Sequence, residues 1–104
     1  MNNPNPKTPQ GQAPVQVKIE LDPDTAQGMY INMAMVNHSE SEFTLDFIFV
    51  QPQEPKGKVR ARIISSPKHT KRLLAALQDS ITVFERKFGV IDVSGAPAPS
   101  GMIN

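Results

Sequence analysis

Alternation of apolar and polar residues is the feature that most constrains the fold of this chain. In four segments, about 15–22, 28–37, 42–51 and 57–65, apolar side chains recur at every second position. A period of two places such side chains on one face of a β-strand. The apolar positions all carry odd numbers: Val15, Val17, Ile19, Leu21, Met29, Ile31, Met33, Met35, Phe43, Leu45, Phe47, Phe49, Val59, Ala61 and Ile63. We therefore expect four strands that share one apolar face.

The connections between these segments are short and rich in turn-forming residues, which favours antiparallel hairpins. They contain Asp22, Pro23 and Gly28, the polar stretch 37–41 and the proline-containing stretch 51–57. In an antiparallel sheet, residues directly opposite each other share a face. The expected partners are Leu21 with Met29, Met35 with Phe43 or Leu45, and Asp46 with Arg62. The sequence thus predicts a four-stranded antiparallel β-meander.

A long amphipathic helix is predicted after the last strand. Ser66 is a favoured N-cap residue, and Pro67 suits the first helical position. Gly89 is a typical residue for ending a helix. Apolar residues between them recur at helical spacing: Leu73, Leu74, Leu77, Ile81, Phe84 and Phe88. We expect a helix over residues 67–88 and an α+β fold.

The two ends of the chain differ from the segment between them. Residues 1–14 are rich in proline and amide side chains, which predicts a disordered arm. Residues 92–104 resemble a second flexible tail, so the single domain is expected over 15–91. Either end is a solvated segment without a role, or a partner-binding tail that uses Met102 and Ile103 as apolar anchors.

The predicted sheet is too wide for one helix to cover. Four strands span roughly 19 Å, whereas one helix is about 10 Å across. Apolar residues also occur at even positions: Tyr30, Ala34, Val36, Ile48, Val50 and Ile64. Such surfaces usually form interfaces, so we expect an oligomer, most simply a symmetric dimer. Its expected interface residues are Met33, Met35, Phe47, Phe49, Ile48 and Val50. Alternatively, the tails or a curled sheet cover these residues.

Catalytic and metal chemistry find little support in the residue types present. The chain has no cysteine, which excludes disulfides and thiolate ligands within it. His38 and His69 show no metal-ligand spacing, and turn chemistry explains the Asp22 and Asp24 pair better than a metal site does. There is no nucleophile motif or glycine-rich phosphate loop. We expect no enzymatic activity, no cofactor, no bound metal and no membrane span, in a cytoplasmic protein.

Charge is strongly segregated along the chain, although the net charge is only +1. Residues 20–54 contain seven acidic and no basic residues, whereas residues 56–72 contain seven basic and no acidic ones. Three cations lie in the first helical turns, where the helix dipole is already positive. Such a helix start favours anion or nucleic-acid binding through Arg60, Arg62, Lys68, His69, Lys71 and Arg72. Alternatively, the acidic segment of the same or a neighbouring subunit neutralises these charges.

Asp46 is an acidic residue within a strongly apolar strand. The expected register places it opposite Arg62, on the same face as Arg60. A cross-strand ion pair explains this arrangement. The functional alternative is a polar recognition surface that includes Asp46 and Arg62.

Many short motifs, in matching order and spacing, relate residues 17–91 to a known family. They include Ile19-Glu20-Leu21-Asp22, Gly28-Met29-Tyr30, Asn37-His38-Ser39, Ser41-Glu42-Phe43, Leu45-Asp46-Phe47, Arg62-Ile63-Ile64, Ser66-Pro67-Lys68-His69, the run from Lys71 to Leu77, and Phe88-Gly89. In these motifs the chain resembles the prokaryotic family called domain of unknown function 3467. The resemblance implies no activity, but it singles out His38, Asp46, Arg62 and His69 as polar positions. A looser similarity in fold links a meander with one helix to SecB-type export chaperone subunits.

Taken together, these features favour a non-enzymatic, oligomeric binding or scaffold protein that contacts a protein partner or an unfolded client. Surfaces rich in methionine suit adaptable binding of this kind. The alternative is an anion or nucleic-acid binder that uses the basic fourth strand and the helix start.

Overall fold

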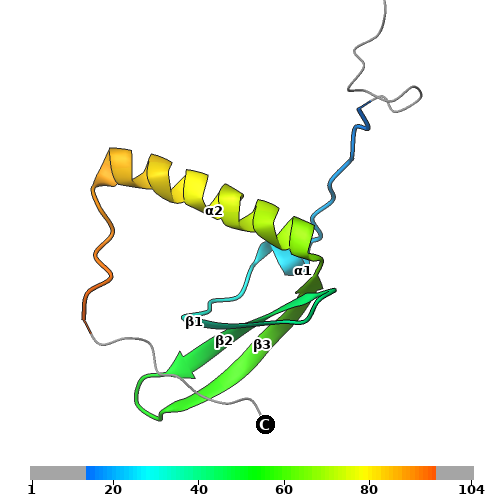
Figure 1. Cartoon of the computed structure of the whole chain (residues 1–104). Coiled ribbons are helices and arrows are strands. Elements are labelled where there is room, and N and C mark those ends of the chain that lie inside the picture. Colours follow the sequence, from blue (N-terminus) through cyan, green and yellow to red (C-terminus); the bar gives the residue numbers. More distant parts are fainter. Residues whose placement is uncertain (1–13, 96–104) are drawn as a thin grey trace, which may run out of the picture.

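The chain forms a three-stranded antiparallel sheet followed by one long helix (Figure 1). A computed structural model describes residues 14–95. The elements follow the order α1 (Pro23–Ala26), β1 (Met33–His38), β2 (Phe43–Gln51), β3 (Lys56–Ser65) and α2 (Pro67–Phe88). The sheet order is β1-β2-β3. The α+β class and the C-terminal helix are confirmed, whereas the expected four strands, and with them the likeness to the SecB-type subunit, are not.

The first predicted strand, residues 15–22, is not part of the sheet of this single chain. Residues 14–22 form an extended segment outside the sheet, and the pairing of Leu21 with Met29 is absent. The reason lies in the next residues, because Asp22 is the N-cap of α1. Its carboxylate accepts hydrogen bonds from the backbone N–H of Thr25 at 3.0 Å and from the Thr25 hydroxyl at 2.7 Å. This capped turn replaces the expected hairpin turn, so the segment runs away from the sheet (Figure 1).

The register between β1 and β2 also differs from the expectation. Met35 lies opposite Asp46, so odd positions of β1 face even positions of β2. The cause is the turn, because four residues separate His38 from its partner Phe43. The Ser39 hydroxyl fixes this turn by accepting hydrogen bonds from two backbone N–H groups, those of Ser41 and Glu42. An even number of turn residues pairs an odd position with an even one.

The pairing of β2 with β3 contains both a confirmed prediction and a correction. Asp46 lies opposite Arg62, as predicted. A β-bulge then shifts the register, since Phe47 pairs with Ala61 but the next residue, Ile48, pairs with Val59. A bulge places one extra residue on one strand, here Arg60, and reverses the alternation beyond it. Val59 and Ala61 therefore lie on opposite faces rather than on one.

These registers divide the sheet into two faces with different character. The aromatic face is Ala34, Val36, Phe43, Leu45, Phe47, Phe49, Ala61 and Ile63. The ion-pair face is Met33, Met35, Asp46, Ile48, Val50, Val59 and Arg62. The buried hydrophobic residues of the described chain all come from the central strand β2: Leu45, Ile48 and Val50. The core is therefore thin, and most other apolar side chains remain at least partly accessible.

The helix α2 has the predicted bounds and the predicted caps. The Ser66 hydroxyl accepts a hydrogen bond from the backbone N–H of His69 at 3.1 Å, and Pro67 occupies the first turn. At the other end, Gly89 has a φ of 98°, which favours glycine. The helix follows β3 with Ser66 alone between them. Neither α1 nor α2 combines the length and apolar character that crossing a bilayer requires.

Candidate functional site

An apolar groove lies between the first half of α2 and the aromatic face of the sheet. It has a volume of about 570 Å³. The sheet contributes Val36, Phe43 and Leu45 to its wall. The helix contributes Pro67, Thr70, Lys71, Leu73, Leu74 and Leu77. The groove exists because α2 leaves the sheet at Ser66 and stands away from it along most of its length (Figure 1).

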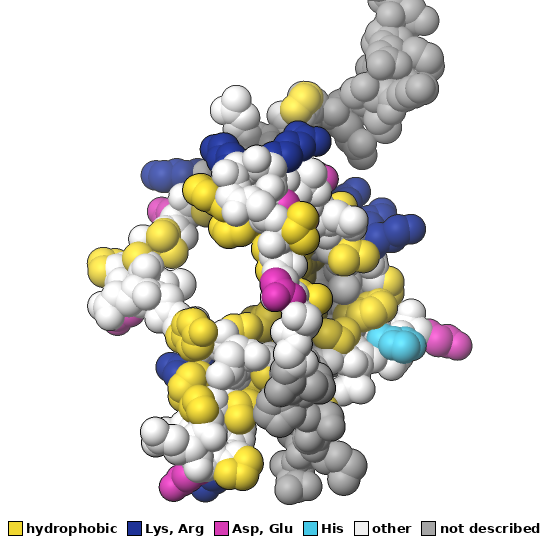
Figure 2. All heavy atoms as spheres, turned by 90° about the vertical axis from the view of Figure 1, so that its left-hand side faces the viewer, with side chains coloured by type: hydrophobic (Ala, Val, Ile, Leu, Met, Phe, Trp, Pro, Cys, Tyr) yellow, Lys and Arg dark blue, Asp and Glu magenta, His cyan; other side chains and the backbone are white. Residues whose placement is uncertain are grey.

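The apolar side of α2 remains accessible in this chain. The helix has no buried residue, and Leu74 and Leu77 are 61% and 53% exposed. Farther along, Phe84 and Phe88 contact each other with ring centroids 4.9 Å apart, yet Phe88 is 72% exposed. Figure 2, seen from the side where α2 ends, shows an opening with hydrophobic side chains around much of its rim. A helix with such an apolar stripe normally packs it against another element.

The start of α2 gives one end of the groove a basic rim. Lys68, His69, Lys71 and Arg72 are all exposed, and Lys71 itself lines the groove. Within residues 14–95 none of the three cations forms an ion pair. Within the described chain, no acidic residue of 20–54 forms an ion pair with them, and neutralisation by a neighbouring subunit stays a prediction. The rim keeps its positive charge beside an apolar surface.

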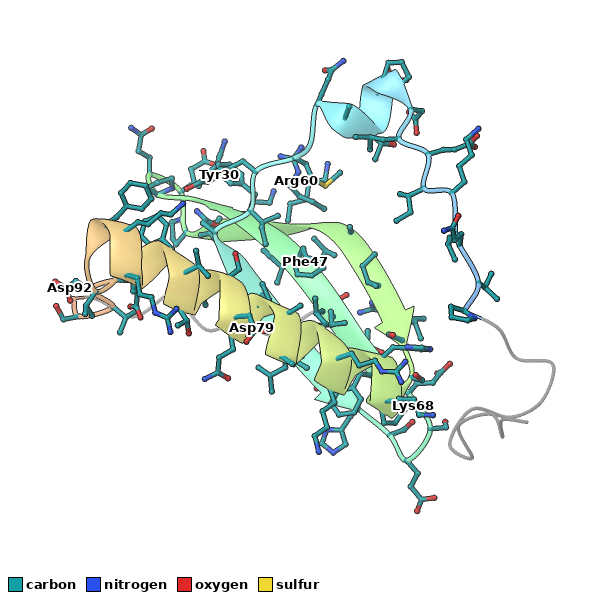
Figure 3. All side chains as sticks on the ribbon, turned by 90° about the horizontal axis from the view of Figure 1, so that it is seen from above. Tyr30, Phe47, Arg60, Lys68, Asp79 and Asp92 are labelled. Carbon is teal, nitrogen blue, oxygen red and sulfur yellow. The ribbon has the colours of Figure 1, made fainter. Side chains whose placement is uncertain are left out.

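Arg60 and Arg62 do not belong to this rim, although the sequence grouped them with it. Arg62 is paired with Asp46. Arg60 lies at the bulge and lines a second hollow of about 300 Å³ with Met29, Phe49, Lys58 and Val59. Figure 3 shows Arg60 and Lys68 well apart along the sheet. The predicted basic surface is thus divided. Four of its six residues lie together at the start of α2, whereas Arg60 and Arg62 lie on β3.

The ion pair of Asp46 and Arg62 has a two-point geometry. Arg62 Nε donates to Asp46 Oδ1 at 2.7 Å, and Arg62 Nη2 donates to Asp46 Oδ2 at 3.0 Å. The Asp46 side chain is fully buried, whereas that of Arg62 is 54% exposed. These hydrogen bonds, together with the Arg62 charge, hold the pKa of Asp46 below its usual value even though burial acts in the opposite direction. The same hydrogen bonds raise the pKa of Arg62.

This pair is better suited to holding the sheet than to chemistry. Its two hydrogen bonds satisfy both carboxylate oxygens, and no buried side-chain polar atom of the described residues lacks a partner. A carboxylate with a lowered pKa is a poor general base near neutral pH. The pair therefore fixes β2 against β3 and leaves about half of the Arg62 side chain exposed.

The six residues predicted for an interface occupy two different faces. Ile48 and Val50 are buried within the chain and are not available to a partner. Met33, Met35, Phe47 and Phe49 are half-buried, with the methionines on the ion-pair face and the phenylalanines on the aromatic face. The ring of Tyr30 contacts that of Phe49 edge to face, with ring centroids 6.1 Å apart. The predicted single patch is thus divided between the two sides of the sheet.

Two residues with clear roles were missed in the sequence. The Asn32 side chain accepts a hydrogen bond from the Val50 N–H at 2.8 Å and donates one to the Val50 carbonyl at 2.9 Å, which continues the pairing beyond β1. Val36 lines the groove. Little in the sequence indicates the role of Asn32, because a single amide in an apolar segment belongs to no motif or regular pattern. Val36 was assigned to the wrong face by the parity argument.

Residues suited to catalysis are scattered rather than clustered. His38 stacks on Phe43 with ring centroids 5.4 Å apart, and His69 lies in the first turn of α2. Within residues 14–95 no group of three or more acidic or histidine side chains is placed to hold a metal ion. The groove with its basic rim is therefore the site with the clearest capacity to bind a ligand.

Comparison with known proteins places the chain in a family. Residues 1–93 match the family model described as "Protein of unknown function (DUF3467)", so the chain belongs to this family, as its motifs indicated. No curated protein and no solved structure matches the chain.

Proposed function

We propose that this member of the DUF3467 family is a non-enzymatic, oligomeric binding protein of the cytoplasm. Its ligand is an apolar segment of a protein partner or unfolded client, held in the groove between α2 and the aromatic face. The observation that carries this proposal is the groove, with its accessible leucines on α2 opposite Phe43 and Leu45. A groove lined in this way suits the apolar face of an amphipathic segment.

Charge narrows the choice of partner. The groove opens beside Lys68, Lys71 and Arg72, and these cations form no ion pair within the described residues. The first acidic residue of α2 is Asp79, three turns from the start. Acidic residues that flank an apolar segment complement this rim, steer its approach and fix its direction in the groove. The proposed ligand is therefore an apolar segment with acidic flanks.

Fluorescence anisotropy with a labelled amphipathic peptide tests this proposal. We expect the full chain to bind a leucine-rich peptide with glutamate flanks, and to bind the same peptide with lysine flanks at least ten times more weakly. Leu77→Asp places a charge in the groove and abolishes binding. Ala75→Asp is the matched control, because Ala75 is an exposed residue of α2 outside the groove lining. Equal binding by these two variants would refute the proposal.

A second candidate, binding of nucleic acid at the basic rim, is favoured by the same unpaired cations. Its ligand contacts Lys68, Lys71 and Arg72 through phosphate groups rather than filling the groove. Titration with a labelled oligonucleotide across a salt series separates the two candidates. Steep salt dependence that is lost in Lys71→Ala/Arg72→Ala supports this candidate, and absence of binding at low salt excludes it.

A further inference from the structure

The two edges of the sheet are protected to very different degrees. The outer edge of β3 carries Lys56, Lys58, Arg60 and Arg62 and contains the bulge. Lysines, arginines and bulges are the features that keep edge strands from pairing with other chains. In contrast, β1 (Met33–His38) carries no Lys, Arg, Asp, Glu or proline, and its register with β2 is continuous. Within residues 14–95, no strand lies on its outer side.

The segment Val15–Leu21 has the properties of a strand without a sheet. Its sequence alternates Val15, Val17, Ile19 and Leu21 with polar residues, and these four side chains are between 67% and 88% exposed. Its backbone makes no hydrogen bond to the rest of the described chain. Valine and isoleucine are among the residues that strands prefer. With seven residues, the segment is long enough to pair with all six residues of β1.

The segment cannot reach β1 of its own chain in the conformation observed. The capped turn α1 follows Leu21, and Gly28, with a φ of 74°, comes after the turn; the segment before them runs away from the sheet (Figure 1). Pairing within one chain requires residues 22–32, which connect the segment to β1, to leave the course observed here. A second copy of the chain can supply the same strand without any change in these residues.

We propose that Val15–Leu21 adds to the outer edge of β1 in a second copy of this chain, so that two copies exchange these strands. The exchange completes a four-stranded sheet in each half and covers the edge that lacks charges. It also places the four exposed apolar side chains on one face of the enlarged sheet, next to side chains of β1. Exchange of identical elements is a common route to symmetric dimers. The proposal specifies the oligomer assumed in the proposed function, but it does not involve the groove.

The mass of the full chain in solution provides the first test. At micromolar concentration, light scattering should give twice the 11.4 kDa of one chain. Val17→Asp/Ile19→Asp should give a monomer. Gln16→Asp/Lys18→Asp places the same two aspartates on the polar side of the segment and should remain a dimer. Because the segment is exposed in the single chain, the circular dichroism of either variant should retain the helical signal of α2.

Cross-linking identifies the surface that pairs, since the chain has no cysteine of its own. A chain with Ala34→Cys is mixed with chains that carry one cysteine at each position from 16 to 20. Disulfide-linked dimers should form with alternate positions only, and a chain with Glu54→Cys should form none with Ala34→Cys. A monomeric native chain, a dimer mass unchanged by Val17→Asp/Ile19→Asp, or an absence of disulfides between Ala34→Cys and every position from 16 to 20 each overturns the proposal. Peptide binding in the groove is measured separately, so its failure is distinguishable from failure of the strand exchange.

Discussion

A side chain at Gly57 would crowd two buried residues of β2, Ile48 and Val50. The stability of Gly57→Ala therefore measures how tightly these residues are packed. Gly57 pairs with Val50 across β2 and β3. A Cβ atom at this position would lie 3.1 Å from Ile48 Cγ2 and 3.3 Å from Val50 Cγ2. Carbon atoms in contact prefer separations of about 3.5–4.0 Å. Either the two side chains or the backbone of β3 must shift by a few tenths of an ångström.

The magnitude of the effect follows from what surrounds the two contacted methyl groups. Ile48 and Val50 are 4% and 9% exposed, and branching at Cβ restricts their rotamers. Overpacking of such a site costs about 1–3 kcal/mol. Alanine recovers about 0.5–1 kcal/mol, because glycine loses more conformational freedom in a strand. The central values of these ranges, about 2 and about 0.75 kcal/mol, leave an expected net destabilisation of about 1 kcal/mol.

Chemical denaturation of the native chain and Gly57→Ala at one protein concentration gives this difference. A fixed concentration is needed because association shifts apparent stability. In a domain of this size, 1 kcal/mol corresponds to about 4–8 °C in Tm. Val50→Ala removes one of the two contacted methyl groups, so Gly57→Ala should cost at least about 0.5 kcal/mol less in that background. A Gly57→Ala chain as stable as the native one would refute this account of the packing.

Two further predictions concern the polar contacts of β2. Folding lowers the pKa of Asp46, so its ionised form stabilises the fold above the usual carboxyl pKa of about 3.9, and this contribution is lost as pH falls through the lower pKa of the folded state. The Tm values of the native chain and Asp46→Asn, followed from pH 7 to pH 2, should therefore differ at pH 7 and converge below about pH 4; a constant difference contradicts the ion pair. Asn32→Ala leaves the Val50 N–H and carbonyl without their side-chain partner, at a cost of about 1–3 kcal/mol. Hydrogen exchange at the Val50 amide should accelerate in Asn32→Ala but not in Asn37→Ala, and equal protection in both variants would show that the Asn32 contact is unimportant.

The sequence was most informative where local signals agreed with one another. The bounds of α2 were predicted correctly, because Ser66, Pro67 and Gly89 are specific for helix ends and the apolar period lies between them. The strands β2 and β3 and the pairing of Asp46 with Arg62 were also predicted, since a short turn between strongly alternating segments leaves few registers. The family was identified from its motifs and is confirmed by the match over residues 1–93.

The errors arose where the pairing of strands depends on the number of residues in a turn or bulge, or on which strand lies next to another. The shared odd parity was treated as one common face, but a four-residue turn before Phe43 and one extra residue at Arg60 each reversed the alternation. Periodicity describes a strand by itself and does not specify its neighbour. For the same reason, residues 15–22 have a strand pattern although no strand of the described chain pairs with them. The groove was not predicted because the helix was expected to lie on the sheet.

Because Ser66 is the one residue between β3 and α2, the angle between the helix and the sheet depends on the backbone at Ser66. The 22 residues of α2 extend about 33 Å from this residue. A rotation of about 10° at Ser66 therefore moves the far end of the helix by about 6 Å, while the first turn hardly changes its place. The same rotation moves Leu73 and Leu77 by about 2 and 3 Å, and Phe84 and Phe88 by about 5 and 6 Å. A small change of angle at Ser66 thus alters the height of the phenylalanine end above the sheet about twice as much as the height of the groove at Leu77.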